Sequence, residues 1–229
     1  MVLPCDWGSA LDVGIIGGTG PLGSALAARL AASGLSVVVG SRVREKADEV
    51  AERLRAQWSG LETLRGGEND EAIRSETVVV AVPWESVVKT VEPFTRLLAG
   101  KVVLSLANAL MKMGSEFSAI EVPRGSIAQL LQSTLPESQV VAALHHVPAR
   151  ELANLSHPIE VDTLVCSDFP EAKERAISLL GRVPGLRALD AGSLAQAGAI
   201  EAMTAVILNV NQRYHARSSI RLTGLEGEG

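Results

Sequence analysis

Hydrophobic residues along the chain follow two alternating patterns, short runs rich in β-branched residues and longer stretches with a helical period. The short runs, which are typical of buried strands, are Asp12–Gly17, Leu35–Gly40, Thr77–Val82, Lys101–Leu106 and Gln139–Leu144. The longer stretches, which predict helices, are Leu22–Ser33, Arg44–Trp58, Trp84–Leu98 (where Pro93 favours a break) and Arg124–Gln132. This alternation predicts an α/β fold built on a doubly wound parallel sheet.

The pattern changes after residue 144. Strands are expected at Thr163–Ser167 and Leu186–Asp190, and helices at Pro170–Arg182 and Ser193–Tyr214. We therefore expect three parts: an N-terminal extension at residues 1–10, a doubly wound domain at 11–144, and a smaller C-terminal α/β lobe at 145–229. Ligands of such folds bind beyond the carboxyl ends of the strands, which here means the junction of the two lobes.

Composition narrows the class of partner. Among 229 residues, 47% are hydrophobic and the formal net charge is -5, so the chain is globular and neither nucleic acid nor an acidic membrane surface is an expected partner. Any anion that it binds must therefore meet a local cationic site. Cys5 and Cys166 show no metal-ligand spacing, and no leader or membrane span is expected, so we expect a reduced, cytoplasmic protein without a metal site.

A glycine-rich loop follows the first predicted strand and opens the first predicted helix. Its residues are Gly18, Thr19, Gly20, Pro21, Leu22 and Gly23, a complete GxGxxG pattern in the context that it requires. The first glycine is expected to allow the tight turn, Gly20 to let the backbone approach a pyrophosphate, and Gly23 to let the helix pack close to the sheet. The loop therefore predicts a Rossmann-type dinucleotide site, with the phosphates at a helix N-terminus.

The end of the second predicted strand indicates which dinucleotide binds. An NAD site requires a carboxylate there to hold the ribose 2′-hydroxyl. This chain has Ser41 and Arg42 instead, with Lys46 one helical turn later. A hydroxyl, a guanidinium and an ammonium group form a site for a dianionic phosphate, so the sequence predicts NADP as the cofactor.

No residue pattern identifies a group that would remove a proton from an alcohol. The chain has no YxxxK pair, and the central histidines His145 and His146 have no carboxylate at a suggestive spacing. Apolar segments follow three strand ends, at Pro83–Trp84, Ala107–Leu110 and Val147–Ala149. Hydride transfer between two stacked planar cofactors needs apolar walls and no such base.

Several segments, in this order, resemble one known family. They are Gly17–Gly23, Val39–Arg42, Val82–Glu85, Ala143–Ala149 and Leu189–Gly192. Over Val13–Leu222 the chain resembles the NADPH-dependent reductases of coenzyme F420, an 8-hydroxy-5-deazaflavin. The resemblance implies reversible hydride transfer between C4 of the nicotinamide and C5 of the deazaflavin, with no assigned catalytic acid or base.

The resemblance also implies roles for residues of the site. Thr19 to Leu22 would contact the phosphates of NADP, and Ser41, Arg42 and Lys46 would hold its 2′-phosphate. The nicotinamide and ribose region would be lined by Pro83, Trp84, Leu110 and Ala149. The deazaflavin would lie near His145 and Ile220. The start of the helix after Arg124 is expected to add Ile127 to the deazaflavin wall.

Other functions also fit the residues. One is a related NADP reductase of an imine, a flavin or a ferric acceptor, although a pyrroline-carboxylate reductase needs a longer helical region than residues 145–229 offer. Another is an NADP-binding sensor without turnover, because missing catalytic residues fit it equally well. The apolar face of Ser193–Tyr214 indicates either a homodimer contact or packing within the lobe.

Overall fold

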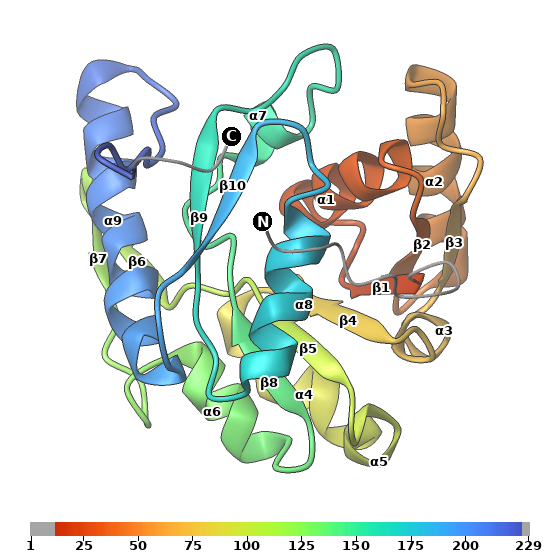
Figure 1. Cartoon of the computed structure of the whole chain (residues 1–229), viewed down its shortest axis with the longest axis horizontal. Helices are drawn as coiled ribbons and strands as arrows, with labels where there is room; N and C mark the ends of the chain where they lie inside the picture. The colour runs from red at the N-terminus through yellow and green to blue at the C-terminus, as the bar shows by residue number, and fades with distance from the viewer. Residues whose placement is uncertain (1–11, 226–229) are drawn as a thin grey trace.

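The computed structural model describes residues 12–225, which form a six-stranded parallel sheet covered by helices on both faces (Figure 1). The strands lie in the order β3 (Leu64–Glu68), β2 (Ser36–Ser41), β1 (Asp12–Ile16), β4 (Thr77–Val80), β5 (Val102–Ser105) and β8 (Gln139–Ala142). The chain runs outward from β1 in one direction and then outward from β4 in the other. This order confirms the doubly wound α/β fold and creates a crevice beyond β1 and β4. The expected extension, residues 1–10, lies outside the described residues.

Two apolar clusters hold the helices against the two faces of the sheet. One cluster joins β1 and β2 to the helices α1 (Pro21–Ala32), α2 (Arg44–Gln57) and α8 (Pro170–Leu180). The other joins β4 and β5 to α4 (Val87–Val91), α6 (Ile127–Thr134) and the start of α9 (Ala197–Tyr214). The other helical elements of residues 12–225 are the short helices α3 (Asn69–Ile73), α5 (Thr95–Leu98) and α7 (Ala149–Leu152) and the 3-10 turns η1 (Trp84–Ser86), η2 (Glu92–Phe94) and η3 (Leu194–Gln196).

Two helices differ from the predicted ones for local reasons. The helix expected at Arg124–Gln132 begins at Ile127, because Arg124 and Gly125 have left-handed φ values of 72° and 91°. The Ser126 side chain then caps the helix by accepting the backbone N–H of Gln129 at 3.0 Å. The helix expected at 84–98 is divided into two α and two 3-10 segments, with Pro93 in the second 3-10 turn, as a break at that residue predicts.

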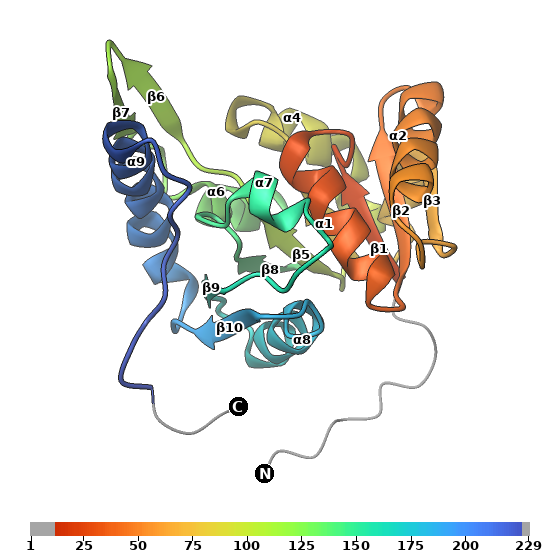
Figure 2. The ribbon, with the colours of Figure 1, turned by 90° about the horizontal axis from the view of Figure 1, so that it is seen from above.

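Five elements were not predicted. The strand β3 contains Gly66 and Gly67, and α3 (Asn69–Ile73) has only five residues, so neither has a distinct pattern. The strands β6 (Leu110–Met113) and β7 (Glu116–Ala119) form an antiparallel hairpin beside α9. The short helix α7 follows Pro148. Figure 2 shows the hairpin and α9 at one side of the molecule, with α2 and β3 at the other.

The C-terminal part continues the core of the first part. The strands β9 (Val161–Val165) and β10 (Leu186–Asp190) form a parallel pair around α8 and meet β8 through an antiparallel bridge between Ala142 and Cys166. Both apolar clusters contain residues from either side of position 144. The division of the chain at residue 144 stays a prediction.

The segment after α9 lies along β9 and is held by a buried carboxylate. The backbone N–H of Asp162 donates to the Ile220 carbonyl at 2.9 Å, and the Asp162 carboxylate accepts the N–H of Leu222 at 2.7 Å. Arg187 donates two hydrogen bonds to the same carboxylate. Burial alone would raise the pKa of Asp162, but these hydrogen bonds lower it on balance.

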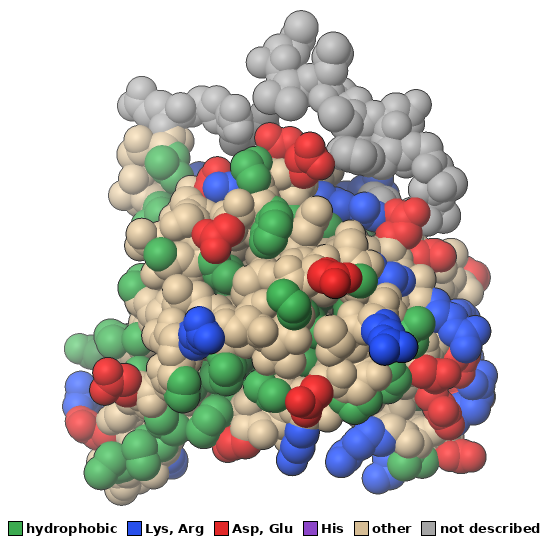
Figure 3. Space-filling model, turned by 90° about the horizontal axis from the view of Figure 1, so that it is seen from below, with side chains coloured by type: hydrophobic (Ala, Val, Ile, Leu, Met, Phe, Trp, Pro, Cys, Tyr) green, Lys and Arg blue, Asp and Glu red, His purple; other side chains and the backbone are tan. Residues whose placement is uncertain are grey.

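The lengths of the helices and the side chains of one face describe the outside of the molecule. No described helix is long and apolar enough to cross a membrane. The face seen in Figure 3 carries side chains of both charges, scattered among apolar ones. A cationic site for an anion must therefore be formed by a few specific residues.

Candidate dinucleotide-binding site

The glycine loop between β1 and α1 has the conformation that a phosphate-binding turn requires. The left-handed residue of the turn is Gly17, with a φ of 71°, rather than Gly18, to which the sequence assigned the turn. Gly18 instead packs against the sheet and donates its N–H to the Gly40 carbonyl at 2.9 Å. A Cβ at Gly23 would lie 2.9 Å from the Gly18 Cα, so this glycine does permit the close packing of α1.

The N-terminus of α1 is open in front of the loop. Gly20 is the N-cap residue and Pro21 begins the helix, with no side chain capping the free N–H groups. A Cβ at Gly20 would have its nearest neighbour at 3.5 Å, so the space beyond its backbone is free. Free N–H groups, the positive end of the helix dipole and this space fit a pyrophosphate.

A cavity of about 340 Å³ joins the loop to the end of β2. Thr19, Gly20, Ser41, Arg42 and Lys46 all line it, so the structure brings these predicted residues together. The cations Arg42 and Lys46 are exposed, and neither forms an ion pair with a described residue. A hydroxyl and two unpaired cations at one opening fit a 2′-phosphate.

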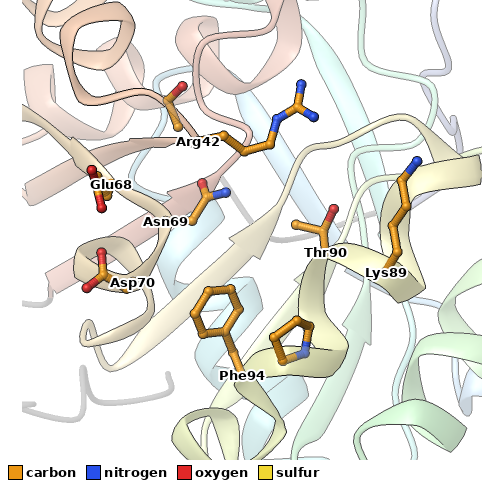
Figure 4. A pocket seen from close by; sticks show the side chains of 9 residues that line it. Arg42, Glu68, Asn69, Asp70, Lys89, Thr90 and Phe94 are labelled. Atoms are coloured by element: carbon orange, nitrogen blue, oxygen red, sulfur yellow. The ribbon is translucent and has the colours of Figure 1, made fainter.

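A second cavity, of about 460 Å³, adjoins the first and shares Ser41 and Arg42 with it (Figure 4). Asn69, from the start of α3, points into this cavity between Arg42 and Phe94. Its side chain is 8% exposed, and its buried Oδ1 has no hydrogen-bond partner among the described residues. Lys89 of α4 lies on the far wall, and its ammonium group lies on the same side as the Arg42 guanidinium.

These cavity residues were missed by the sequence analysis. Asn69 directly follows β3, and that strand was not predicted, so the asparagine had no visible place at the carboxyl edge of the sheet. Lys89 and Thr90 lie on a helical turn where a cation and a hydroxyl are ordinary. Recognition of β3 would have been the signal for Asn69.

A third cavity, of about 400 Å³, continues from the glycine loop toward α9. The predicted residues Pro21, Leu22, Pro83, Trp84 and Leu110 line it. The opposite wall consists of Thr204 and Leu208 from α9. Most of its lining is apolar, as a slot for a nicotinamide ring requires.

A fourth cavity, of about 600 Å³, adjoins the third, and Thr204 and Leu208 line both spaces. His145 lies in its inner wall, where its carbonyl accepts hydrogen bonds from Asn108 and Thr204. The His145 side chain is 4% exposed, and neither ring nitrogen has a partner at normal hydrogen-bond geometry within residues 12–225.

The protonation state of His145 follows from this burial. Burial, together with the neighbouring His146, lowers the pKa of His145 to about 3, although the backbone of Leu106 and Ala107 opposes the shift. The imidazole is therefore neutral at physiological pH. A neutral ring can face an aromatic ligand but does not supply a cation.

Three predicted residues are placed apart from these spaces. Ile127 is 1% exposed within the core, and its backbone N–H donates to the Glu201 carboxylate at 2.9 Å. Ala149 begins α7 and, like Ile127, lines none of the cavities described here. Ile220 lines a separate cavity of about 530 Å³ between the C-terminal segment and Pro148.

Comparisons with known proteins show which family the sequence is similar to. Residues 12–109 match the family described as "NADP oxidoreductase coenzyme F420-dependent". The F420-dependent NADP reductase of Methanocaldococcus jannaschii is 34% identical over 223 residues, covering 94% of this chain and 100% of that protein. The enzyme of the same name from Methanothermobacter thermautotrophicus is 32% identical, covering 94% and 96%.

The fold is also found among solved structures. A crystal structure of a protein from Arthrobacter sp. FB24 superposes with a TM-score of 0.78 at 21% identity, covering 93% of this chain and 100% of that one. At this level of identity the likeness concerns the fold alone.

Proposed function

The chain belongs to the family of coenzyme F420-dependent NADP oxidoreductases, and we propose how its site serves that chemistry. It is an oxidoreductase that transfers a hydride between NADP(H) and coenzyme F420. The bound cofactors supply the reacting carbons, C4 of the nicotinamide and C5 of the deazaflavin. The protein must hold the two rings face to face, with these carbons about 3–3.5 Å apart, and exclude water.

The phosphate-binding part of the proposal starts at the glycine loop. The pyrophosphate is contacted by Thr19, Gly20, Pro21 and Leu22. The conformation of the loop depends on Gly18 and Gly23. The support is the uncapped N-terminus of α1 and the free space at Gly20.

The 2′-phosphate end is assigned to Ser41, Arg42 and Lys46. Their shared cavity and the absence of ion pairs to either cation among the described residues support this. Each charge-assisted hydrogen bond to the phosphate contributes about 1.5–3 kcal/mol, which is ample to favour NADP over NAD.

The adenine ring is assigned to the adjoining cavity. An asparagine amide matches the donor and acceptor edge of adenine, and the Asn69 side chain points into this space. Arg42 and Phe94 supply flat faces for stacking, and Lys89 adds a further cation near the 2′-phosphate.

The two reacting rings are assigned to the third and fourth cavities. Pro83, Trp84 and Leu110 line the nicotinamide side. His145 is the deazaflavin-side residue with the strongest support, because it is buried and unpartnered beside the shared residue Thr204. The two ring cavities are not lined by Ala149, Ile127 or Ile220. We propose that these residues support the wall of the deazaflavin cavity from outside its lining.

The observation that carries the proposal is a series of three adjoining cavities that share lining residues. The first cavity contains Arg42 and shares Gly20 with the third, and the third shares Thr204 with the fourth, which contains His145. This arrangement fits two cofactors that bind with their rings in contact. No side chain is assigned as an acid or base, because direct hydride transfer requires none and His145 is neutral.

The test is to mix the purified chain with NADPH and oxidised F420 and to record the visible absorbance of the deazaflavin. The absorbance should fall with NADPH and fall much more slowly with NADH. An FMN arm and an imine arm test the related reductases. Binding of NADPH without loss of deazaflavin absorbance would instead favour a sensor.

We also propose that the chain forms a homodimer through one face of α9. Val206, Val210 and Tyr214 lie at helical spacing on this face, and they are 62%, 39% and 77% exposed. Met111 and Met113 of the adjacent hairpin are exposed as well. Light scattering should give the mass of a dimer, and Val206→Glu should give the monomer mass; a wild-type monomer would contradict the proposal.

We also propose a cytoplasmic location. Cys166 is a free, buried thiol, as expected in a reducing compartment, and both cofactors act within cells. Cell fractionation with an antibody against the chain would test it, and recovery outside the cytoplasmic fraction would contradict it.

A further inference from the structure

We propose that the outer end of the fourth cavity binds the anionic side chain of the deazaflavin coenzyme, through Arg150 and Arg217. This inference rests on the proposed function. The side chain of coenzyme F420 carries a phosphodiester and glutamate carboxylates on a ribityl chain, whereas 8-hydroxy-5-deazariboflavin ends at the ribityl hydroxyls. The two compounds share the reacting ring and differ in the negative charge.

The lining of the cavity changes from apolar to cationic along its length. Its inner part contains Val147, Ile207 and Leu208 beside the buried His145. The remaining lining includes Arg150 and Arg217 together with polar groups. A ligand with an aromatic head and an anionic tail matches this order of surfaces.

The two arginines are available to an anion to different degrees. Arg150 on α7 is exposed and makes no ion pair within the described part of the chain. Arg217 lies 3.3 Å from a Glu151 carboxylate oxygen through one of its terminal nitrogens, and its side chain is 58% exposed. The guanidinium group has five N–H donors, so Arg217 retains several for a ligand. The net charge of -5 makes these local cations decisive for anion binding.

Buried contacts fix the backbone on both sides of the cavity. Behind Arg150, the buried guanidinium of Arg29 donates to the carbonyls of Glu151, Leu152 and Asn154. Beside Arg217, the Asn211 amide oxygen accepts the N–H of Ser218 at 2.6 Å. The arginines therefore extend from held backbone positions, which lowers the entropy cost of binding.

The experiment compares two ligands on the full-length chain by fluorescence titration. Wild-type protein should bind F420 about tenfold more tightly than 8-hydroxy-5-deazariboflavin, and higher ionic strength should reduce this difference. Arg150→Ala and Arg217→Ala should each weaken F420 binding by roughly threefold to tenfold and leave the truncated compound almost unaffected. The control is Arg213→Ala, at an exposed arginine that is paired with Glu116 and lies outside the cavity lining.

The outcomes separate this inference from the proposed function. Equal binding of the two compounds by wild-type protein, or equal weakening of both by the arginine variants, would overturn the inference and leave the proposed function standing. Failure of wild-type protein to bind either compound would overturn the proposed function itself, and the inference with it.

Discussion

The two halves of the site are constructed differently. The NADP half depends on backbone conformation in two short segments, Gly17–Gly23 and Ser41–Lys46, which lie at the ends of neighbouring strands. The second half depends on side chains from segments far apart in the chain, at 145–150 and 204–218. A change in the first half is therefore expected to affect one cofactor sharply. A change in the second half is expected to act through single side-chain contacts with the ligand or through packing.

The largest effect is expected from Gly20→Val in the NADP half. Gly20 has an extended backbone with φ of −72°, which valine readily adopts, and a side chain there enters the free space before α1. NADPH affinity should fall by about a hundredfold or more, while Tm changes little, because the loss is a steric exclusion of the pyrophosphate. Calorimetric titration and thermal unfolding measure the two quantities. Unchanged NADPH affinity would disprove the loop assignment.

A smaller effect, limited to one phosphate, is expected from Arg42→Ala. Loss of a charge-assisted hydrogen bond should weaken NADPH binding by roughly tenfold to a hundredfold and raise KM much more than it lowers kcat. NADH binding should not change. Arg53→Ala, at an exposed position on the following helix α2, is the matched control. Equal losses for NADPH and NADH would argue against a role at the 2′-phosphate.

In the second half, Glu201→Gln tests the packing of α6 against α9. Burial raises the pKa of Glu201 to about 7, although the N–H groups of Ile127 and Ala128 oppose this shift. An unfolded glutamate has a pKa of about 4.3, so the contribution of Glu201 to stability is fully present below that pH and is lost as the pH rises through about 7.

Glutamine does not titrate, so the wild-type advantage in unfolding free energy should shrink by about 3 kcal/mol between acid and neutral pH. Denaturant unfolding at several pH values measures it, and the difference between the two proteins removes the contributions of other groups. A constant difference across this range would show that Glu201 does not titrate as described.

The smallest effect is expected from Asp162→Asn, which loosens the C-terminal segment. The amide places an NH2 donor where Oδ1 accepts from the Arg187 Nε, and it removes the charge that holds Arg187, whose guanidinium also donates to the Leu222 carbonyl. Deazaflavin affinity should fall by roughly threefold, while NADPH affinity stays the same. Ligand titrations with both cofactors test this. A larger loss for NADPH than for the deazaflavin would contradict the separation of the two halves.

The same contrast explains what the sequence could predict. The sheet, the glycine loop and the Ser41–Arg42 pair follow from local patterns, because strand periodicity and glycine spacing act over a few residues. Asn69 was missed because β3 contains two glycines and lacks a strand pattern. The convergence of Thr204, Arg150 and Arg217 on one cavity depends on tertiary packing between distant segments, which no local pattern encodes. Ile127 was assigned to a cofactor wall, and its burial in the core depends on a helix start that Arg124 and Gly125 delay.

The central claim is direct hydride transfer from one bound cofactor to the other. The most direct measurement uses NADPH that carries deuterium at the transferable C4 position, with oxidised F420 as acceptor and mass spectrometry of the product. Transfer between stacked rings predicts deuterium at C5 of the reduced deazaflavin, with none lost to solvent. Reduced deazaflavin without deuterium, from NADPH labelled on either face of C4, would contradict direct transfer between the two rings.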